Sequence, residues 1–274
     1  MEALWARLSR ADNNLAELNR LVEEGINNGE AHSVFAEQDP DTGEMVLCGV
    51  GRDIPRSWGP LVGDIVHGLR AALDNLVWSL SAHFSSSPPP PNPIPRKDRW
   101  RKVAFPVVTD PSKWATVAGK CLWVIEDRRP HLVDEFKDLQ PFHTRQNAPE
   151  REPLAILEEL WNIDKHRHPP LVALWTEVDP LDILAEPTFP GGRFRVVSTS
   201  SSRPLEADAV ELARFKPYGL FPQAGVEVNV NYGIGVDIAF NQGAPAFGGE
   251  VIDTLQACRA DVAKAIRRFA PELG

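Results

Sequence analysis

The chain has 274 residues, of which 43% are hydrophobic and 24% charged, and its formal net charge is −9. This length and composition are typical of a globular protein with a sizeable core, and they exclude disorder over the whole chain. The acidic balance opposes a surface that follows a polyanion, so we do not expect nucleic acid as a partner.

The cysteines and the N-terminus indicate the compartment. Three widely spaced cysteines form no CxxC or Cys/His pair, which fits a reducing environment. The N-terminal run MEALWARLSRADNN has an acid at position 2 and no apolar core of signal-peptide length. No window approaches the roughly eighteen apolar residues of a membrane helix. We therefore expect a cytoplasmic protein with no membrane partner, and the ratio of 21 arginines to 8 lysines suggests a GC-rich bacterial genome.

The first half of the chain predicts long helices around one hairpin. Leucines spaced by three, four and seven residues predict a helix over 3–28. Two alternating runs joined by DPDTG predict a β-hairpin over 33–51. A broad apolar face predicts a helix over 59–84, and the proline run SSSPPPPNPIP ends it in an exposed loop over 85–95.

The second half changes from helices to strands. Helical segments continue to 168, alternating runs predict strands over 171–240, and a last helix is expected over 249–270. Within the strands, we expect 225–232 and 234–240 to pair as neighbouring antiparallel strands. The early hairpin is able to pair with the late strands, so we predict a single α+β domain, residues 1–274. In it, a helical bundle-like half packs with a mainly antiparallel sheet, and a C-terminal helix closes the fold.

A polar stripe runs along the helix predicted over 59–84. His67, Arg70, Asp74 and Trp78 stack beside its apolar face. One interpretation is a solvated flank with a single ion pair. Trp78 favours another, because so large a side chain is seldom left in water, and we expect another segment to cover this face.

The helix predicted over 151–168 offers a partner for that stripe. Asp164 falls within its apolar arc, and a buried carboxylate needs a counterion. We expect the two helices to pack together, with Asp164 largely buried and bonded to Arg70 or His67. His166 follows at the C-terminal end, where a cation also complements the helix dipole, so capping is the alternative role for this histidine.

Three segments carry a resemblance to other proteins. LRAALDNLVW (69–78), LQPFH (139–143) and LEELWNIDKHR (157–167) resemble a recurring pattern in uncharacterised bacterial proteins, many of them actinobacterial. The resemblance implies an architecture and a pair of motifs, with no activity attached to them. It directs attention to a set of polar residues: Arg70, Asp74, Asn75, Asn162, Asp164, His166 and Arg167.

Searches for established catalytic motifs return nothing specific. GxxxxGK[ST], GxGxxG after a strand, GxSxG and HExxH are all absent from the sequence. A metal held by His67, Asp74, Asp164 and His166 is conceivable, but the spacing is not diagnostic and the cofactor stays unknown. The Asn-x-x-x-His-Arg run resembles the helical HEPN ribonucleases, although no histidine has an arginine five to seven residues before it.

Two functions remain open. We favour a non-enzymatic module that binds a small molecule or a protein partner, with a buried Arg/Asp/His network. The alternative is a hydrolase or nuclease-like enzyme with a composite site. Its catalytic residues would be His166 as acid or base, Asp164 to orient it and Arg70 to bind an anionic group. In either case we expect the ligand to contact a shared set of residues: His67, Asp74, Asn75, Trp78, Asn162 and Arg167.

Overall fold

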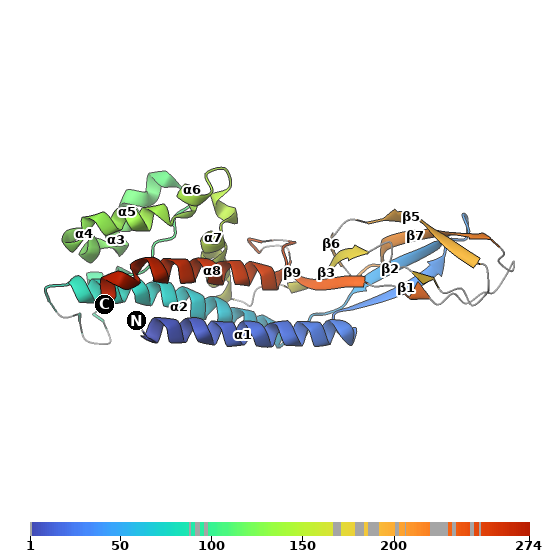
Figure 1. Ribbon diagram of the computed structural model, residues 1–274, viewed down its shortest axis with the longest axis horizontal. Helices are drawn as coiled ribbons and strands as arrows, with labels where there is room; N and C mark the ends of the chain where they lie inside the picture. Colours follow the sequence, from blue (N-terminus) through green and yellow to red (C-terminus); the bar gives the residue numbers. More distant parts are fainter. Residues whose placement is uncertain are drawn as a thin grey trace.

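The structure is a computed structural model of the chain. It describes residues 2–87, 89–90, 94–95, 98–166, 171–178, 184–185, 192–200, 203–205, 207–219, 230–231, 234–241, 244–246 and 248–274. The molecule is elongated, with a helical half at one end and strands at the other (Figure 1). Both termini lie in the helical half, at the end far from the strands.

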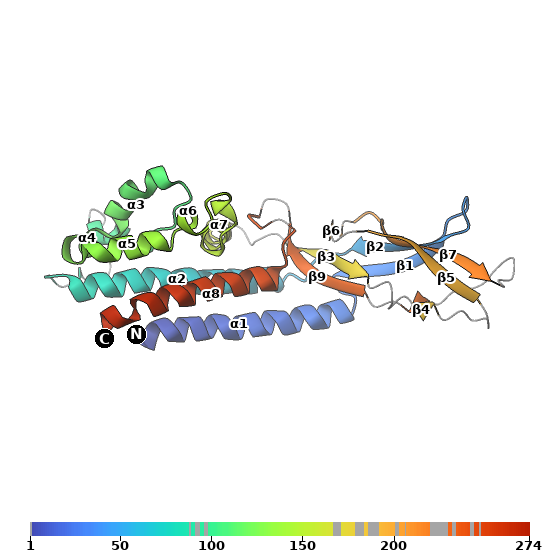
Figure 2. The same ribbon diagram turned by 45° about the horizontal axis from the view of Figure 1, so that its top comes forward.

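Three long helices lie side by side and form the centre of the helical half (Figure 2): α1 (Glu2–Asn27), α2 (Trp58–Phe84) and α8 (Val251–Phe269). α2 is buried along most of its length because apolar residues recur on a broad face. An ion pair between Arg259 of α8 and Asp12 of α1 joins two of these helices at 2.6 Å. Gly25 permits a close approach of α1 to the start of α2, since an added Cβ would lie 2.6 Å from the Trp58 ring.

Short helices cover one side of this centre. They are α3 (Trp114–Cys121), α4 (Trp123–Arg128), α5 (Pro130–Asp138), α6 (Pro141–Thr144) and α7 (Pro153–Asp164). Four 3₁₀ turns accompany the helices: η1 (Arg99–Lys102), η2 (Pro111–Lys113), η3 (Pro149–Arg151) and η4 (Ala270–Leu273). Pro130, Pro141 and Pro153 begin α5, α6 and α7, where the missing N–H of proline costs no helical hydrogen bond.

The strands form antiparallel sheets. The largest has the order β1 (His32–Gln38), β2 (Met45–Gly51), β7 (Val210–Gly219), β5 (Gly192–Thr199). A second has the order β6 (Arg203–Pro204), β3 (Leu171–Val178), β9 (Ile234–Phe240), and β4 (Leu184–Ala185) pairs with β8 (Val230–Asn231). One continuous cluster of buried side chains joins the two larger sheets to the helices.

The predicted α+β fold class is confirmed, including the long closing helix. The early hairpin does pair with a late strand, β7. The pairing expected for 225–232 with 234–240 is wrong in the described part of these runs, because β8 pairs with β4 whereas β9 pairs with β3. Residues 225–229 and 232 lie outside the described residues, as do 88 and 91–93 of the proline run. The expected exposure of that loop stays a prediction.

Candidate functional site

Arg70 is the best-buried charged side chain of the predicted stripe and has contacts on every side. It is 5% exposed. Its Nη2 donates to the carbonyl oxygen of Phe105 at 2.9 Å. Nη1 lies 3.0 Å from Asp74 Oδ1, and Nε lies 2.8 Å from Glu158 Oε2. These two carboxylate contacts are ion pairs with angles outside hydrogen-bond geometry, so their attraction is chiefly coulombic.

An indole from α7 completes the surroundings of Arg70. The Arg70 guanidinium lies 5.2 Å from the centroid of the Trp161 ring, within cation–π range. Lys165 also contacts this ring, with its ammonium 3.0 Å from the centroid. The cluster of Arg70, Asp74, Glu158, Trp161 and Lys165, which we call the Arg70 cluster, therefore holds two cations and two carboxylates.

Asp74 connects the Arg70 cluster to the backbone of the segment that contains Phe105. Its Oδ1 accepts a hydrogen bond of 2.9 Å from the backbone N–H of Phe105. Burial raises the pKa of the Asp74 carboxyl, and Arg70 and the Phe105 N–H oppose that rise. Arg70 and Asp74 thus bind the carbonyl and the amide of the same residue, which fixes its backbone against α2.

The charges of this cluster affect the pKa of the nearby Cys121 thiol. Burial raises the pKa of its thiol, with Arg70 opposing and Asp74 and Glu158 reinforcing that shift. A thiol with a raised pKa is protonated at neutral pH, so Cys121 is not an activated nucleophile.

The expected cover over Trp78 is present. The Trp78 ring packs edge-on against Trp100 of η1, with centroids 4.9 Å apart, and Trp100 in turn contacts Trp123. The prediction that another segment lies over this face of α2 is therefore confirmed.

The predicted pair between Arg70 and Asp164 is not the one that forms. α7 does pack on α2, but the carboxylate that it brings to Arg70 is Glu158. Asp164 is half-buried and lies against Gly63, where an added Cβ would collide with its carboxylate. The expectation that Asp164 is largely buried is met in part, because the residue is neither fully buried nor exposed. Gly63, which Asp164 contacts, lies seven residues before Arg70 on α2. At the α-helical rise this is about 10 Å along the helix axis.

Three of the other predicted residues that the structure describes are Asn75, Asn162 and His166, and they differ in exposure. His166 and Asn162 are exposed, and the amide oxygen of Asn162 accepts a hydrogen bond from Lys165 at 3.0 Å. Asn75 is half-buried on α2. Arg167 lies outside the described residues. The structure therefore brings Arg70 and Asp74 together and places His166 in solvent.

His67 does not join the Arg70 cluster, contrary to the expectation that it shares a network there. It is exposed and lines a hollow of about 200 Å³ between α1 and α2. Residues of both helices line this hollow, which we call the α1–α2 groove: Arg7, Arg10, Ala11, Asn14, Asp64, His67 and Gly68. Arg7, Arg10 and Asn14 are not among the residues predicted from the sequence, although their spacing of three and four puts them on one stripe of a helix.

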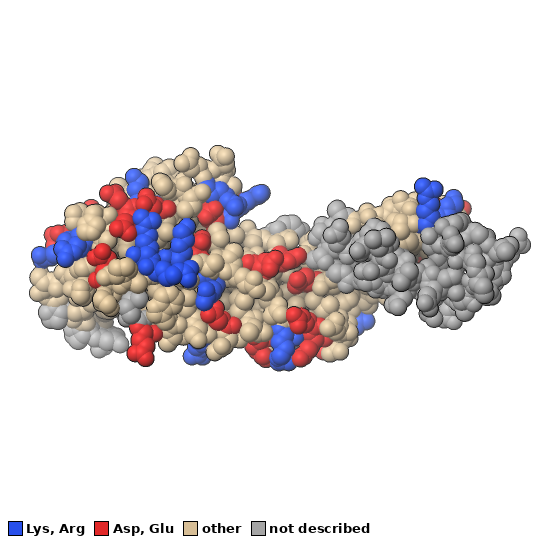
Figure 3. Space-filling model, viewed as in Figure 1, with Lys and Arg blue, Asp and Glu red and all other residues tan. Residues whose placement is uncertain are grey.

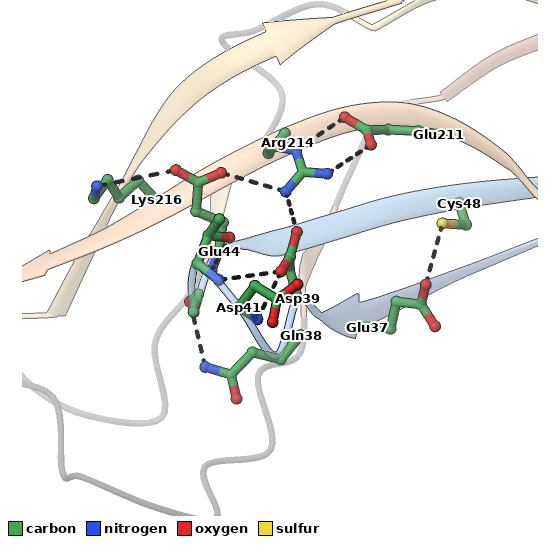
Figure 4. A network of polar contacts seen from close by, with 11 residues as sticks. Glu37, Gln38, Asp39, Asp41, Glu44, Cys48, Glu211, Arg214 and Lys216 are labelled. Atoms are coloured by element: carbon green, nitrogen blue, oxygen red, sulfur yellow. Dashed lines mark hydrogen bonds and ion pairs between the residues drawn. The ribbon is translucent and has the colours of Figure 1, made fainter.

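The hairpin carries a second polar network that the sequence analysis missed (Figure 4). Arg214 of β7 contacts Asp39 at 2.6 Å, Glu44 at 3.4 Å and Glu211 at 2.8 Å. Asp39 Oδ1 also accepts the backbone N–H groups of Asp41 and Thr42, which is the turn expected from DPDTG. Arg214 pulls the pKa of the Asp39 carboxyl down to about 2.

Charges of both signs are interleaved over the helical half in the view of Figure 3. Arg268 of α8, for example, lies between Glu135 and Asp138 of α5 at 3.0 and 2.8 Å.

In the described part of the chain, no three side chains of the metal-ligating types His, Cys, Asp and Glu gather as a metal site would require. No described helix combines the length and the hydropathy needed to cross a membrane.

Comparison with known proteins adds no relative: no family model, no curated protein and no solved structure matches this chain.

Proposed function

We propose that this protein is a binding module that holds a small ligand or a protein partner without transforming it, and that the Arg70 cluster has a structural role. The observation that carries the proposal is that oxygen atoms of the protein already surround the Arg70 guanidinium. Each of its three guanidinium nitrogens has an oxygen neighbour, at 2.8, 3.0 and 2.9 Å.

An arginine that binds substrate needs a free edge for an incoming anion. At Arg70 that anion would have to displace Asp74, Glu158 or the Phe105 carbonyl, and Trp161 lies against the guanidinium. The cluster is also formally neutral, since Lys165 and Arg70 balance two carboxylates, so it has little attraction for a negative substrate.

The alternative is a composite hydrolase site of Arg70, Asp164 and His166. A general base has to reach the reacting group together with the anion clamp. Asp164 contacts Gly63, seven residues before Arg70 on α2, and this separation argues against such a site.

The test begins with a panel of small molecules and measures which of them raise the thermal unfolding midpoint. Binding to the native state alone raises it by mass action. We expect each ligand that does so to be recovered chemically unchanged after prolonged incubation.

His166→Ala supplies the matched control for chemistry, because the side chain is exposed and its loss leaves the core intact. With chromogenic phosphodiester and carboxylic ester substrates, wild-type protein and His166→Ala should both turn over at the background rate. Turnover by the wild type that falls about 100-fold or more in His166→Ala, the scale of a lost general base, would overturn the proposal.

A further inference from the structure

The α1–α2 groove is hollow because the side chains at its floor are small. Ala11 is buried, and a Cβ added at Gly68 would sit 3.9 Å from the Ala11 Cβ, an ordinary contact distance. The two helices thus meet closely at this level, and longer side chains flank the meeting point: Arg7, Arg10 and Asn14 from α1, Asp64 and His67 from α2.

The arginines of the groove differ from Arg20 and Arg259 of the same helix bundle, which carboxylates hold. Arg20 of α1 is held by Glu17 and Glu24, both at 2.7 Å, and Arg259 of α8 by Asp12 at 2.6 Å. Among the described residues, neither Arg7 nor Arg10 forms an ion pair within 4.0 Å. Their N–H donors are therefore available to a ligand.

The lining of the groove has a positive balance on an acidic protein. Asp64 is the carboxylate of the lining, against the guanidiniums of Arg7 and Arg10, while Asn14 adds an amide and His67 an imidazole. Arginine binds phosphate and carboxylate groups through paired N–H donors, so two unpaired arginines in a hollow select an oxyanion.

The size of the groove limits what enters it. A volume of about 200 Å³ equals the liquid share of roughly seven water molecules. It accommodates an anionic head group, with the remainder of a larger molecule left in solvent.

We propose that the α1–α2 groove binds the oxyanion group of a small molecule, a phosphate or a carboxylate, through Arg7, Arg10, Asn14 and His67. This inference rests on the proposed binding function and assigns it a site and a ligand chemistry. Asp64 opposes the anion, which makes the two arginines jointly necessary.

The experiment titrates the whole protein with inorganic phosphate, and in a second arm with acetate, at constant ionic strength. The readout is the NMR shift of the Gly68 backbone amide and the Asn14 side-chain amide. We expect saturable shifts with the wild type. In Arg7→Gln/Arg10→Gln the dissociation constant should rise at least about tenfold, since one charge-assisted hydrogen bond alone is worth about that factor.

Arg20→Gln is the matched control, because it removes an arginine of the same helix that glutamates already hold. It should bind as the wild type does. A lower dissociation constant for phosphate than for acetate assigns a phosphoryl ligand to the groove, and a lower one for acetate assigns a carboxylate.

Absence of saturable shifts in the wild type, or equal binding by the double variant, overturns the inference. If a ligand from the thermal panel still binds the double variant, only the groove is wrong and the binding function stands. Phosphate in the groove together with turnover that depends on His166 would instead overturn the proposed function alone.

Discussion

Arg70 shows how one side chain joins three parts of a chain. From α2 it contacts the carbonyl of Phe105, the carboxylate of Glu158 on α7 and the ring of Trp161. A buried guanidinium is costly unless all of its donors face oxygen atoms, so these contacts must form together. Arg70 therefore couples the packing of α7 on α2 to the position of the segment around Phe105.

Glu158→Gln tests this coupling at the residue that the sequence analysis overlooked. The amide cannot neutralise Arg70, although Asp74 remains, and we expect the free energy of unfolding to fall by about 1–3 kcal/mol. Glu159→Gln makes the same change at the next, exposed position and should stay within about 0.5 kcal/mol of the wild type. Denaturant unfolding measures both, and equal values would show that the Glu158 pair contributes nothing.

Gly63 and Gly68 form a second matched pair on α2. Alanine is the better helix former by about 1 kcal/mol, which favours substitution at either position. At Gly63, however, the new methyl group would collide with Asp164, whereas at Gly68 it would lie 3.9 Å from Ala11. We expect Gly63→Ala to lower the unfolding free energy by about 1–3 kcal/mol and Gly68→Ala to leave it equal or higher. Stabilisation by Gly63→Ala would mean that the Asp164 carboxylate is not held against Gly63.

At the scale of elements, the turn of the β1–β2 hairpin is fixed from within and from a third strand. The Asp39 carboxylate accepts N–H groups of its own turn, and Gly43 takes the left-handed conformation, with φ of +70°. Arg214 of β7 then binds Asp39 and Glu44, which flank the turn. The hairpin is thereby attached to a strand far along the chain, since Glu44 and Arg214 are 170 positions apart.

The pKa of Asp39 depends on the contact of the hairpin with Arg214 of β7, so it can be used to test that contact. Its folded pKa of about 2 is below the ordinary 3.8, so its contribution to stability is present above pH 4 and is lost as the pH falls toward 2. In Arg214→Met the Asp39 midpoint should rise, yet stay below 3.8 because the turn N–H groups remain. Carboxyl NMR measures the midpoint. Lys216→Met, which removes a contact with Glu44 only, should leave it in place, and an unchanged midpoint in Arg214→Met would contradict the network.

The positions of the helices and strands could be predicted from the sequence, but how they align along one another could not. Apolar periodicity places α1, α2 and α8 within a residue or two, and alternation places the β1–β2 hairpin and β9, with further strands between residues 171 and 240. The same periodicity put Asp164 on the side of α7 that faces α2, and it does lie there, against Gly63. Periodicity does not state how far along α2 the contact falls. For that reason the sequence predicts Asp164 as the partner of Arg70, whereas the structure places Glu158 against Arg70. The pairing of β8 with β4 could not be predicted for the same reason.

At the scale of the whole molecule, neither half is built from a continuous stretch of chain. The helical half combines α1, α2 and α8, and the largest sheet combines β1 and β2 with β5 and β7 (Figure 1). Buried residues of β2, β7 and β9 belong to the same hydrophobic cluster as those of the helices. Loss of packing at one end therefore removes contacts that the other end depends on.

We accordingly expect a single cooperative unfolding transition. Phe269 at the end of α8 is fully buried and stacks on Phe136, with ring centroids 4.1 Å apart, so Phe269→Ala should cost about 3–5 kcal/mol. Leu212 of β7 is equally buried at the other end, and Leu212→Ala should cost about 2–5 kcal/mol. Scanning calorimetry should show one peak for each protein, with matching calorimetric and van't Hoff enthalpies. Hydrogen exchange in β2 and β7 should accelerate in Phe269→Ala as much as exchange in α2 does. Two resolved peaks, with Phe269→Ala moving one and Leu212→Ala the other, would show instead that the helices and the sheets fold as separate units despite their shared core.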